Sequence, residues 1–180
     1  ELRVAFDLDD RGLSPAITGT VYFVGMALGQ LVYGVLADRF GRRPVLLAGI
    51  GIYAVGALAS TIAPNLAVLL VARFVWGLGA SAPTVMRFAI ARDLYAGDQM
   101  ARVVSTFSAV FLLGPIIVPF IGEAILTVGD WRAVFAAALV LAAVTGVWTV
   151  RFGETLDPAN RRTLQLAPLL DALRAVAATP

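Results

Sequence analysis

The stretch Gly34-Val-Leu-Ala-Asp38-Arg39-Phe-Gly41-Arg42-Arg43-Pro44 decides the fold of this chain. It is a short turn with three arginines and one aspartate, and it separates two apolar runs at about 15–37 and 44–63. Each run is long enough to cross the hydrocarbon core of a bilayer, which takes about 20 apolar residues as a helix. The turn therefore predicts an integral membrane protein with these arginines on the cytoplasmic side.

The composition of the whole chain agrees with a membrane location. Hydrophobic residues make up 59% of the 180 residues and charged residues 14%, whereas a soluble domain carries roughly 25% charged residues. The surplus apolar surface is expected to face lipid. The chain has no Cys and no His, which excludes disulfides and thiol catalysis and argues against a metal site or an enzyme. The net charge of +2, spread over several turns, argues against a nucleic-acid partner.

Three further apolar runs, at about 66–90, 102–128 and 131–152, bring the expected number of spanning helices to five. Lipid leaves the backbone no hydrogen-bond partners, so an open chain crosses it as a helix. The predicted fold is all-α, with an extracytoplasmic segment over 1–14, a transmembrane bundle over 15–152 and a cytoplasmic tail or linker over 153–180. The chain lacks an initiator Met, so we expect it to be part of a longer protein.

The arginines predict the orientation of the bundle, because cytoplasmic loops carry an excess of them. They concentrate in alternate turns, with Arg39, Arg42 and Arg43 in the first, Arg92 and Arg102 in the third, and Arg151 at the end of the last span. The opposite side is poorer in arginine, and its Arg132 lies beside Asp130. We expect a multi-pass cell (inner) membrane protein with its N-terminus outside and its C-terminus in the cytoplasm.

Polar side chains inside the apolar spans are the first candidates for function. Arg73 lies about seven residues inside the third span, hence ~10 Å deep at 1.5 Å per residue. An arginine there costs at least ~2.5–3.5 kcal/mol and is a functional candidate by default, the alternative being a side chain that reaches the interface. Glu123 either reaches the outer interface or titrates in a transport cavity. Gln30 is a weaker cavity candidate, since a Gln in a span also bonds neighbouring helices.

Two backbone features also stand out. Gly34 and Gly41 remove side chains where two helices would approach closely. The fourth span contains Gly114, Pro115 and Pro119. Each proline deletes a backbone hydrogen bond and predicts a kink, either functional or merely a bend that fits the neighbouring helices.

The charged turn resembles the loop signature between the second and third helices of the major facilitator superfamily. The stretch Arg73-Phe-Val-Trp76-Gly77-x-Gly79-Ala80 resembles that family's fourth-helix pattern. The spacing Pro115-x-x-x-Pro119-x-x-Gly122 is similar to the bicyclomycin-resistance (Bcr/CflA-like) branch of drug:proton antiporters, and Arg87-x-Ala89-Ile90-x-Arg92-Asp93-Leu94 supports that branch.

The resemblance implies the N-terminal half of a transporter, lacking its first helix and its C-terminal half. The implied function is proton-coupled efflux of small drugs or amphipathic compounds by alternating access, with substrate, protons and membrane lipid as partners and the proton gradient in place of a cofactor. Arg73 is the main candidate for proton coupling, with Glu123 second. The implied cytoplasmic gate comprises Gly34, Asp38, Arg39, Gly41, Arg42 and Asp93, and the implied antiporter helix contains Gly114, Pro115 and Pro119.

Two other functions fit the same sequence. An importer of a small polar solute would share the fold, although the Gly114-Pro115 kink argues against it. A non-transporting scaffold or receptor would tolerate replacement of Arg73 and Asp38 without loss of function.

Overall fold

The computed structural model describes residues 16–157 and 159, and these form five α-helices and no strand. The helices are α2 (Ala16–Phe40), α3 (Arg42–Thr61), α4 (Leu66–Leu94), α5 (Gly97–Val128) and α6 (Trp131–Arg151). All five are long and apolar enough to cross a membrane. The expected all-α transmembrane fold is therefore confirmed. The segment 1–14 and most of the tail 153–180 lie outside the described residues.

Several helices continue beyond the apolar runs that predicted them. The turn between α4 and α5 illustrates this. Helix α4 ends at Leu94 rather than near residue 90, and α5 begins at Gly97 rather than near residue 102. Hydropathy marks the part of a helix that lies in hydrocarbon, whereas backbone hydrogen bonding continues into the polar turn. At the opposite end, the Asn65 side chain accepts a hydrogen bond from the Val68 N–H at 3.0 Å and caps α4.

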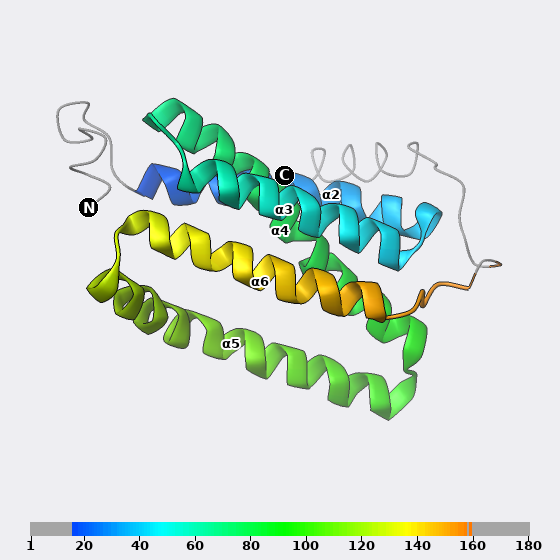
Figure 1. Cartoon of the computed structure of the whole chain (residues 1–180). Coiled ribbons are helices and arrows are strands. Elements are labelled where there is room, and N and C mark those ends of the chain that lie inside the picture. The colour runs from blue at the N-terminus through cyan, green and yellow to red at the C-terminus, as the bar shows by residue number, and fades with distance from the viewer. Residues whose placement is uncertain (1–15, 158, 160–180) are drawn as a thin grey trace, which may run out of the picture.

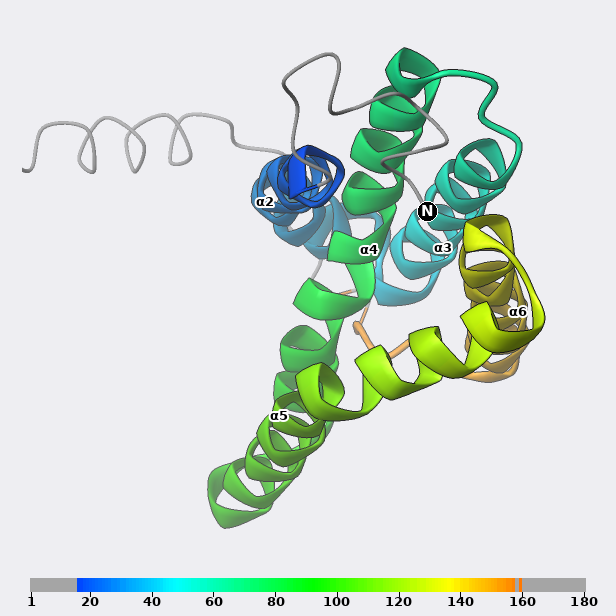
Figure 2. The same ribbon diagram turned by 90° about the vertical axis from the view of Figure 1, so that its left-hand side faces the viewer.

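The central helix of the bundle is α4, which packs against α2 and α3, while α6 packs against α3 (Figures 1 and 2). Small residues allow this close approach. A Cβ atom added at Gly77 would overlap the carbonyl oxygen of Tyr22 on α2, and one added at Gly79 would overlap the backbone of Tyr53 on α3. Helices in lipid associate through such close backbone contacts because no hydrophobic force drives them together.

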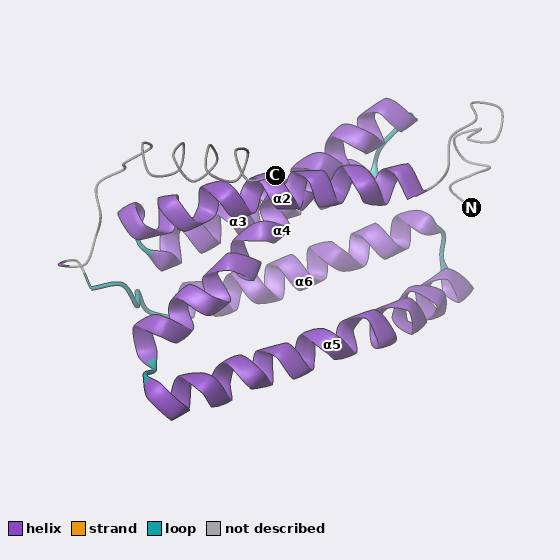
Figure 3. Cartoon of the chain, turned by 180° about the vertical axis from the view of Figure 1, so that it is seen from behind, coloured by secondary structure: helices purple, strands orange, loops and turns teal. Residues whose placement is uncertain are grey.

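Helix α5 is the least covered part of the described chain. None of its residues is buried, and it runs apart from α2 and α3 along the edge of the bundle (Figures 1 and 3). Figure 2 shows that α5 bends, so that its yellow-green C-terminal part runs across the direction of the rest. Pro115 and Pro119 lie inside this helix, and their missing N–H donors give a physical reason for a bend.

Candidate functional site

Four chain segments meet at one end of the bundle, the right-hand end in Figure 1. They are the end of α2, the start of α3, the end of α4 and the residues after α6. Arg42 lies at their centre with a side chain that is only 9% exposed. Its Nη1 donates to Asp38 Oδ1 at 2.6 Å, and its Nε donates to Asp93 Oδ2 at 2.9 Å. One guanidinium thus joins the ends of α2 and α4 to the start of α3, with charge-assisted hydrogen bonds.

The turn between α2 and α3 depends on Gly41. Its φ is 102°, in the region that only glycine adopts without strain. A Cβ atom at this position would also overlap the Glu154 carboxylate. The chain therefore reverses direction within one residue and leaves room for a carboxylate against the first turn of α3.

Glu154, two residues after Phe152 closes α6, fills that space. Its Oε1 accepts from the Arg42 N–H at 2.8 Å and its Oε2 accepts from the Arg43 N–H at 3.2 Å. The same carboxylate accepts from the N–H groups of Thr155 and Leu156, each at 3.0 Å. It acts as an N-cap for α3, where Gly41 has no side chain to serve.

These hydrogen bonds change the acidity of Glu154. Burial by itself raises the pKa, but the backbone N–H groups of Leu156, Arg42, Arg43 and Thr155 stabilise the carboxylate more strongly. The pKa of Glu154 therefore lies below its ordinary value. The side chain is ionised at neutral pH and faces the positive end of the α3 dipole.

One more contact completes this charged cluster, defined as Asp38, Arg42, Asp93, Glu154 and Thr155. The Thr155 hydroxyl donates to Asp93 Oδ2 at 3.4 Å. Nearby, Arg43 Nη2 donates to the Val150 carbonyl near the end of α6 at 2.7 Å. The cluster therefore connects α2, α3, α4 and the segment after α6 at a single point.

Arg73 occupies a different environment, inside the bundle. Its Cζ lies 5.7 Å from the ring centroid of Tyr22 on α2, 5.1 Å from that of Trp76, and 5.0 Å from that of Phe135 on α6. Its Nε is buried without a hydrogen-bond partner in the described part of the chain. None of the described acids forms an ion pair with it. Three aromatic rings thus hold the charge by cation–π attraction, and no carboxylate among residues 16–157 pairs with it.

The other residues singled out from the sequence lie apart from these two sites. Gln30 and Glu123 are exposed, and Arg39 lies over the Phe40 ring at 5.2 Å. No atom lies within 4 Å of a Cβ added at Gly34 or Gly114. The close helix approach expected at Gly34 is therefore wrong for the described helices, because that face of α2 points away from α3 and α4.

Sequence reasoning missed the capping role of Glu154 and the ring partners of Arg73. No local pattern points to Glu154, because its partner groups are backbone amides 111 and 112 residues earlier in the chain. The available signal was Gly41 itself: a helix that begins after a glycine needs its N–H groups satisfied from elsewhere.

Five membrane-length helices, with a charged cluster at one end and an isolated arginine inside, define a multi-pass α-helical membrane protein. The Major Facilitator Superfamily model matches residues 4–180. The chain belongs to this family.

Curated relatives carry names from drug resistance. A bicyclomycin resistance protein homolog of Haemophilus influenzae is 39% identical over 134 residues, which cover 74% of this chain and 34% of that protein. The multidrug resistance protein MdtL of Escherichia coli is 33% identical over 133 residues, with the same coverage of 74% and 34%. The chain therefore spans about a third of the length of the curated relatives that it matches.

A solved structure agrees on the fold. The human organic anion transporter MFSD10 (TETRAN) superposes with a TM-score of 0.69 over 84% of this chain and 34% of that chain, at 23% sequence identity. At this identity the match concerns the arrangement of helices alone.

Proposed function

We propose that this chain is most of the N-terminal half of a drug:proton antiporter that exports small amphipathic compounds by alternating access. The observation that carries the proposal is Arg73, a cation inside a membrane bundle with no acid partner among the described residues. Such a charge is costly in lipid and marks an ion or substrate pathway. The printed names of the two bacterial relatives support drugs as substrates.

The proposed orientation places the charged cluster in the cytoplasm. Arg39, Arg43, Arg92 and Arg151 belong to the helix ends that lie together at the right-hand end of Figure 1. An excess of arginine marks the cytoplasmic side of a membrane protein. The start of α2 would then face the outside of the cell membrane, and the tail after α6 the cytoplasm.

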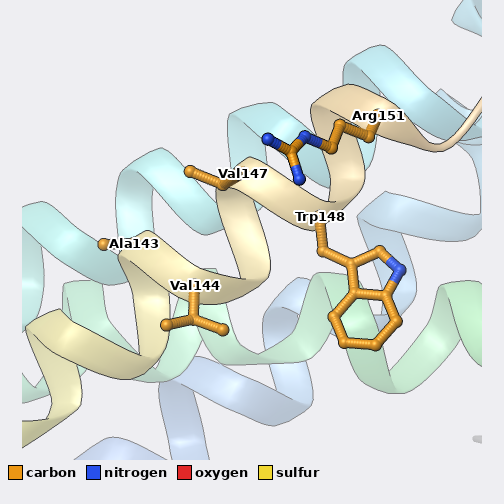
Figure 4. A pocket seen from close by; sticks show the side chains of 5 residues that line it. All are labelled: Ala143, Val144, Val147, Trp148 and Arg151. Atoms are coloured by element: carbon orange, nitrogen blue, oxygen red, sulfur yellow. The ribbon is translucent and has the colours of Figure 1, made fainter.

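The proposed architecture includes a helix that precedes α2 and a C-terminal half. Each half of such a transporter is built from two three-helix repeats, and the five described helices supply one complete repeat and one repeat without its first member. The exposed face of α6 offers a groove of about 570 Å³, lined by Ala143, Val144, Val147, Trp148 and Arg151 (Figure 4). Because α5 and this face of α6 are uncovered, they are the place for the missing helix.

The charged cluster would act as the cytoplasmic gate. Arg42 binds both Asp38 and Asp93, which keeps the ends of α2 and α4 and the start of α3 together. The Asp38 side chain remains 42% exposed, so it has a free oxygen for a helix N-terminus of the other half. Contact at this point would favour the state that is closed to the cytoplasm.

Arg73 would couple transport to protons. Its positive charge favours the ionised form of a nearby carboxyl group. The attraction between the two groups would be lost when that carboxyl group takes up a proton. The partner carboxyl would come from the parts of the transporter outside the described residues, or from Glu123 after a rearrangement of α5.

The test uses inverted membrane vesicles that contain the full-length protein carrying this chain. Drug accumulation in these vesicles should require an imposed proton gradient, and Arg73→Gln should abolish that dependence. Arg132→Gln is the matched control, because Arg132 also lies on an aromatic ring, at 4.4 Å, but near the start of α6 and exposed.

Each alternative predicts a different result. Drug movement out of the inverted vesicles with the proton gradient would indicate an importer. Equal behaviour of wild type, Arg73→Gln and Asp38→Asn, with no flux in any of them, would indicate a scaffold or receptor and overturn the proposal. The 180-residue chain alone should give no proton-linked flux, because it lacks the second half of the cavity.

A further inference from the structure

Arg87 is a second arginine inside α4 that forms no ion pair with any described residue. Its Cζ lies 4.7 Å from the ring centroid of Phe88 and 4.8 Å from that of Phe111 on α5. Its Nε is buried and has no hydrogen-bond partner in that part of the chain. Two aromatic rings therefore hold the guanidinium in place while its Nε–H donor has no partner among the described residues.

Arg87 lies on the same stripe of α4 as Arg73. The two residues are fourteen positions apart, which is nearly four helical turns and about 21 Å along the axis. Between them the stripe carries only Gly77, Ala80 and Thr84, and the Thr84 hydroxyl donates back to the Ala80 carbonyl at 3.1 Å. The stripe is therefore narrow and uncharged between its two arginines.

The ring partners of the two arginines lie on different helices, and α2 also contacts the stripe through Tyr22, which lies against Arg73 and Gly77. Phe111 belongs to α5 and Phe135 belongs to α6, the two helices that run below and beside α4 in Figure 2. No residue of α5 is buried, and α5 is the neighbouring helix that contacts Arg87. A molecule that binds between α4 and α5 would meet the Arg87 guanidinium beside the Phe111 ring.

The charges along this stripe are unbalanced. Arg42 has two carboxylate partners within 3 Å, whereas Arg73 and Arg87 have none among the described residues. Away from the helix ends, the single acid of the described spans is Glu123, which is exposed on α5. Two unpaired cations in an apolar bundle favour a negatively charged ligand.

We propose that Arg87 binds the acidic group of the transported compound, and that this transporter accepts amphipathic organic anions such as aromatic carboxylates and sulfonates. The inference rests on the proposed function, because a transport pathway is what brings substrate to this stripe. The planar guanidinium pairs with a carboxylate through two parallel hydrogen bonds, while Phe111 packs against the apolar body. Arg87 lies about 10 Å from the end of α4 that we assign to the cytoplasm, so an exported anion meets it before Arg73.

The test measures binding to the full-length protein in detergent by equilibrium dialysis. The probe is 2-naphthoate, and 2-naphthamide is its uncharged match in size and shape. The wild type should bind the carboxylate about tenfold more tightly than the amide, the scale of a hydrogen bond to a charged group. Arg87→Gln should remove this preference, and Arg87→Lys should retain part of it because the charge remains but the planar fork is lost.

Arg92→Gln is the matched control, because Arg92 lies on the same helix but is exposed and donates only to the Phe88 carbonyl at 3.4 Å. It should keep the full preference for the carboxylate. Equal binding of the two probes by the wild type, or an unchanged preference in Arg87→Gln, would overturn the proposal. If Arg87→Gln fails to fold, the test rests on Arg87→Lys, which should show a reduced preference for the carboxylate over the amide.

Vesicle export separates this inference from the proposed function. Proton-linked drug export without any preference for the carboxylate would overturn the anion proposal alone. A preference for the carboxylate in a protein that exports nothing would overturn the proposed function and leave the binding site standing.

Discussion

The Glu154 carboxylate accepts a hydrogen bond from the backbone N–H of Arg42 at 2.8 Å, although the two residues are 112 positions apart in sequence. A residue that follows α6 thereby caps the N-terminus of α3. The contact also places Glu154 beside the Arg42 side chain, which binds Asp38 and Asp93. Glu154 therefore both caps α3 and belongs to the charged cluster around Arg42.

Replacing Glu154 by Gln should destabilise the bundle by about 1 kcal/mol, the usual cost of a lost helix cap. The amide keeps one acceptor oxygen but loses the charge that faces the α3 dipole. Thermal unfolding of the purified protein in detergent measures the change. Asp157→Asn is the control, because Asp157 caps only its own turn through Ala159 at 2.9 Å. Equal melting of both variants and the wild type would show that the cap contributes nothing.

The stability that Glu154 contributes should depend on pH in one direction. Its pKa is lower in the folded protein than in an unfolded chain, so the folded state binds the proton less tightly. The contribution is then complete above the ordinary Glu pKa of about 4.3, and it is lost as pH falls through the lower folded value. Melting curves between neutral pH and pH 3 should converge for the wild type and Glu154→Gln. A gap that stays constant over this range would contradict the charge-based explanation.

Gly41→Ala should be more damaging than its small size suggests. The backbone at this position has φ of 102° and ψ of 161°, a conformation that costs a residue with a Cβ about 1–3 kcal/mol, and the new methyl group would also overlap the Glu154 carboxylate. Gly19→Ala, in open space on α2, should be neutral or slightly stabilising because alanine favours helix. Thermal unfolding of the two variants compares them directly, and similar melting would argue against strain at Gly41.

The Arg42–Asp93 pair should show energetic coupling. We expect Arg42→Ala and Asp93→Ala together to cost less than the sum of the single changes, with an interaction energy of about 0.5–3 kcal/mol. The reason is that each single variant leaves a charge without its partner in a site where Arg42 is only 9% exposed. A double-mutant cycle on unfolding in detergent measures this energy. Additive effects would mean that the pair is screened by solvent.

The sequence predicted the features that depend on local pattern. Apolar runs identified five helices, and the turn around Asp38 and Arg42 indicated where charges gather, because both signals lie within single stretches of chain. The helix ends were less accurate, since α4 continues to Leu94 after its hydropathy falls. The caps and ring contacts were not predicted, because Glu154 reaches Arg42 and Phe135 reaches Arg73 only after the helices have packed.

Small-residue packing gives a last prediction, at Gly77. A methyl group there would overlap the carbonyl oxygen of Tyr22, and backbone cannot move aside as a flexible side chain can. Gly77→Ala should therefore force α2 away from α4 and cost about 1–3 kcal/mol, the range for an overpacked core. Gly51→Ala, on a face of α3 with no atom within 4 Å, is the matched control and should not lower stability.

Thermal unfolding of both variants in one detergent gives the comparison, and Trp76 fluorescence adds a local measurement. The Tyr22 ring lies 5.9 Å from the Trp76 ring, so separation of α2 from α4 should shift Trp76 emission in Gly77→Ala and leave it unchanged in Gly51→Ala. Replacing Trp131 and Trp148 by Phe in every variant removes the emission of the other two tryptophans of these 180 residues. The Tyr22 carbonyl that the new methyl group would displace and the Tyr22 ring beside Trp76 belong to one residue. A loss of stability without a spectral shift would therefore contradict displacement of α2 from α4.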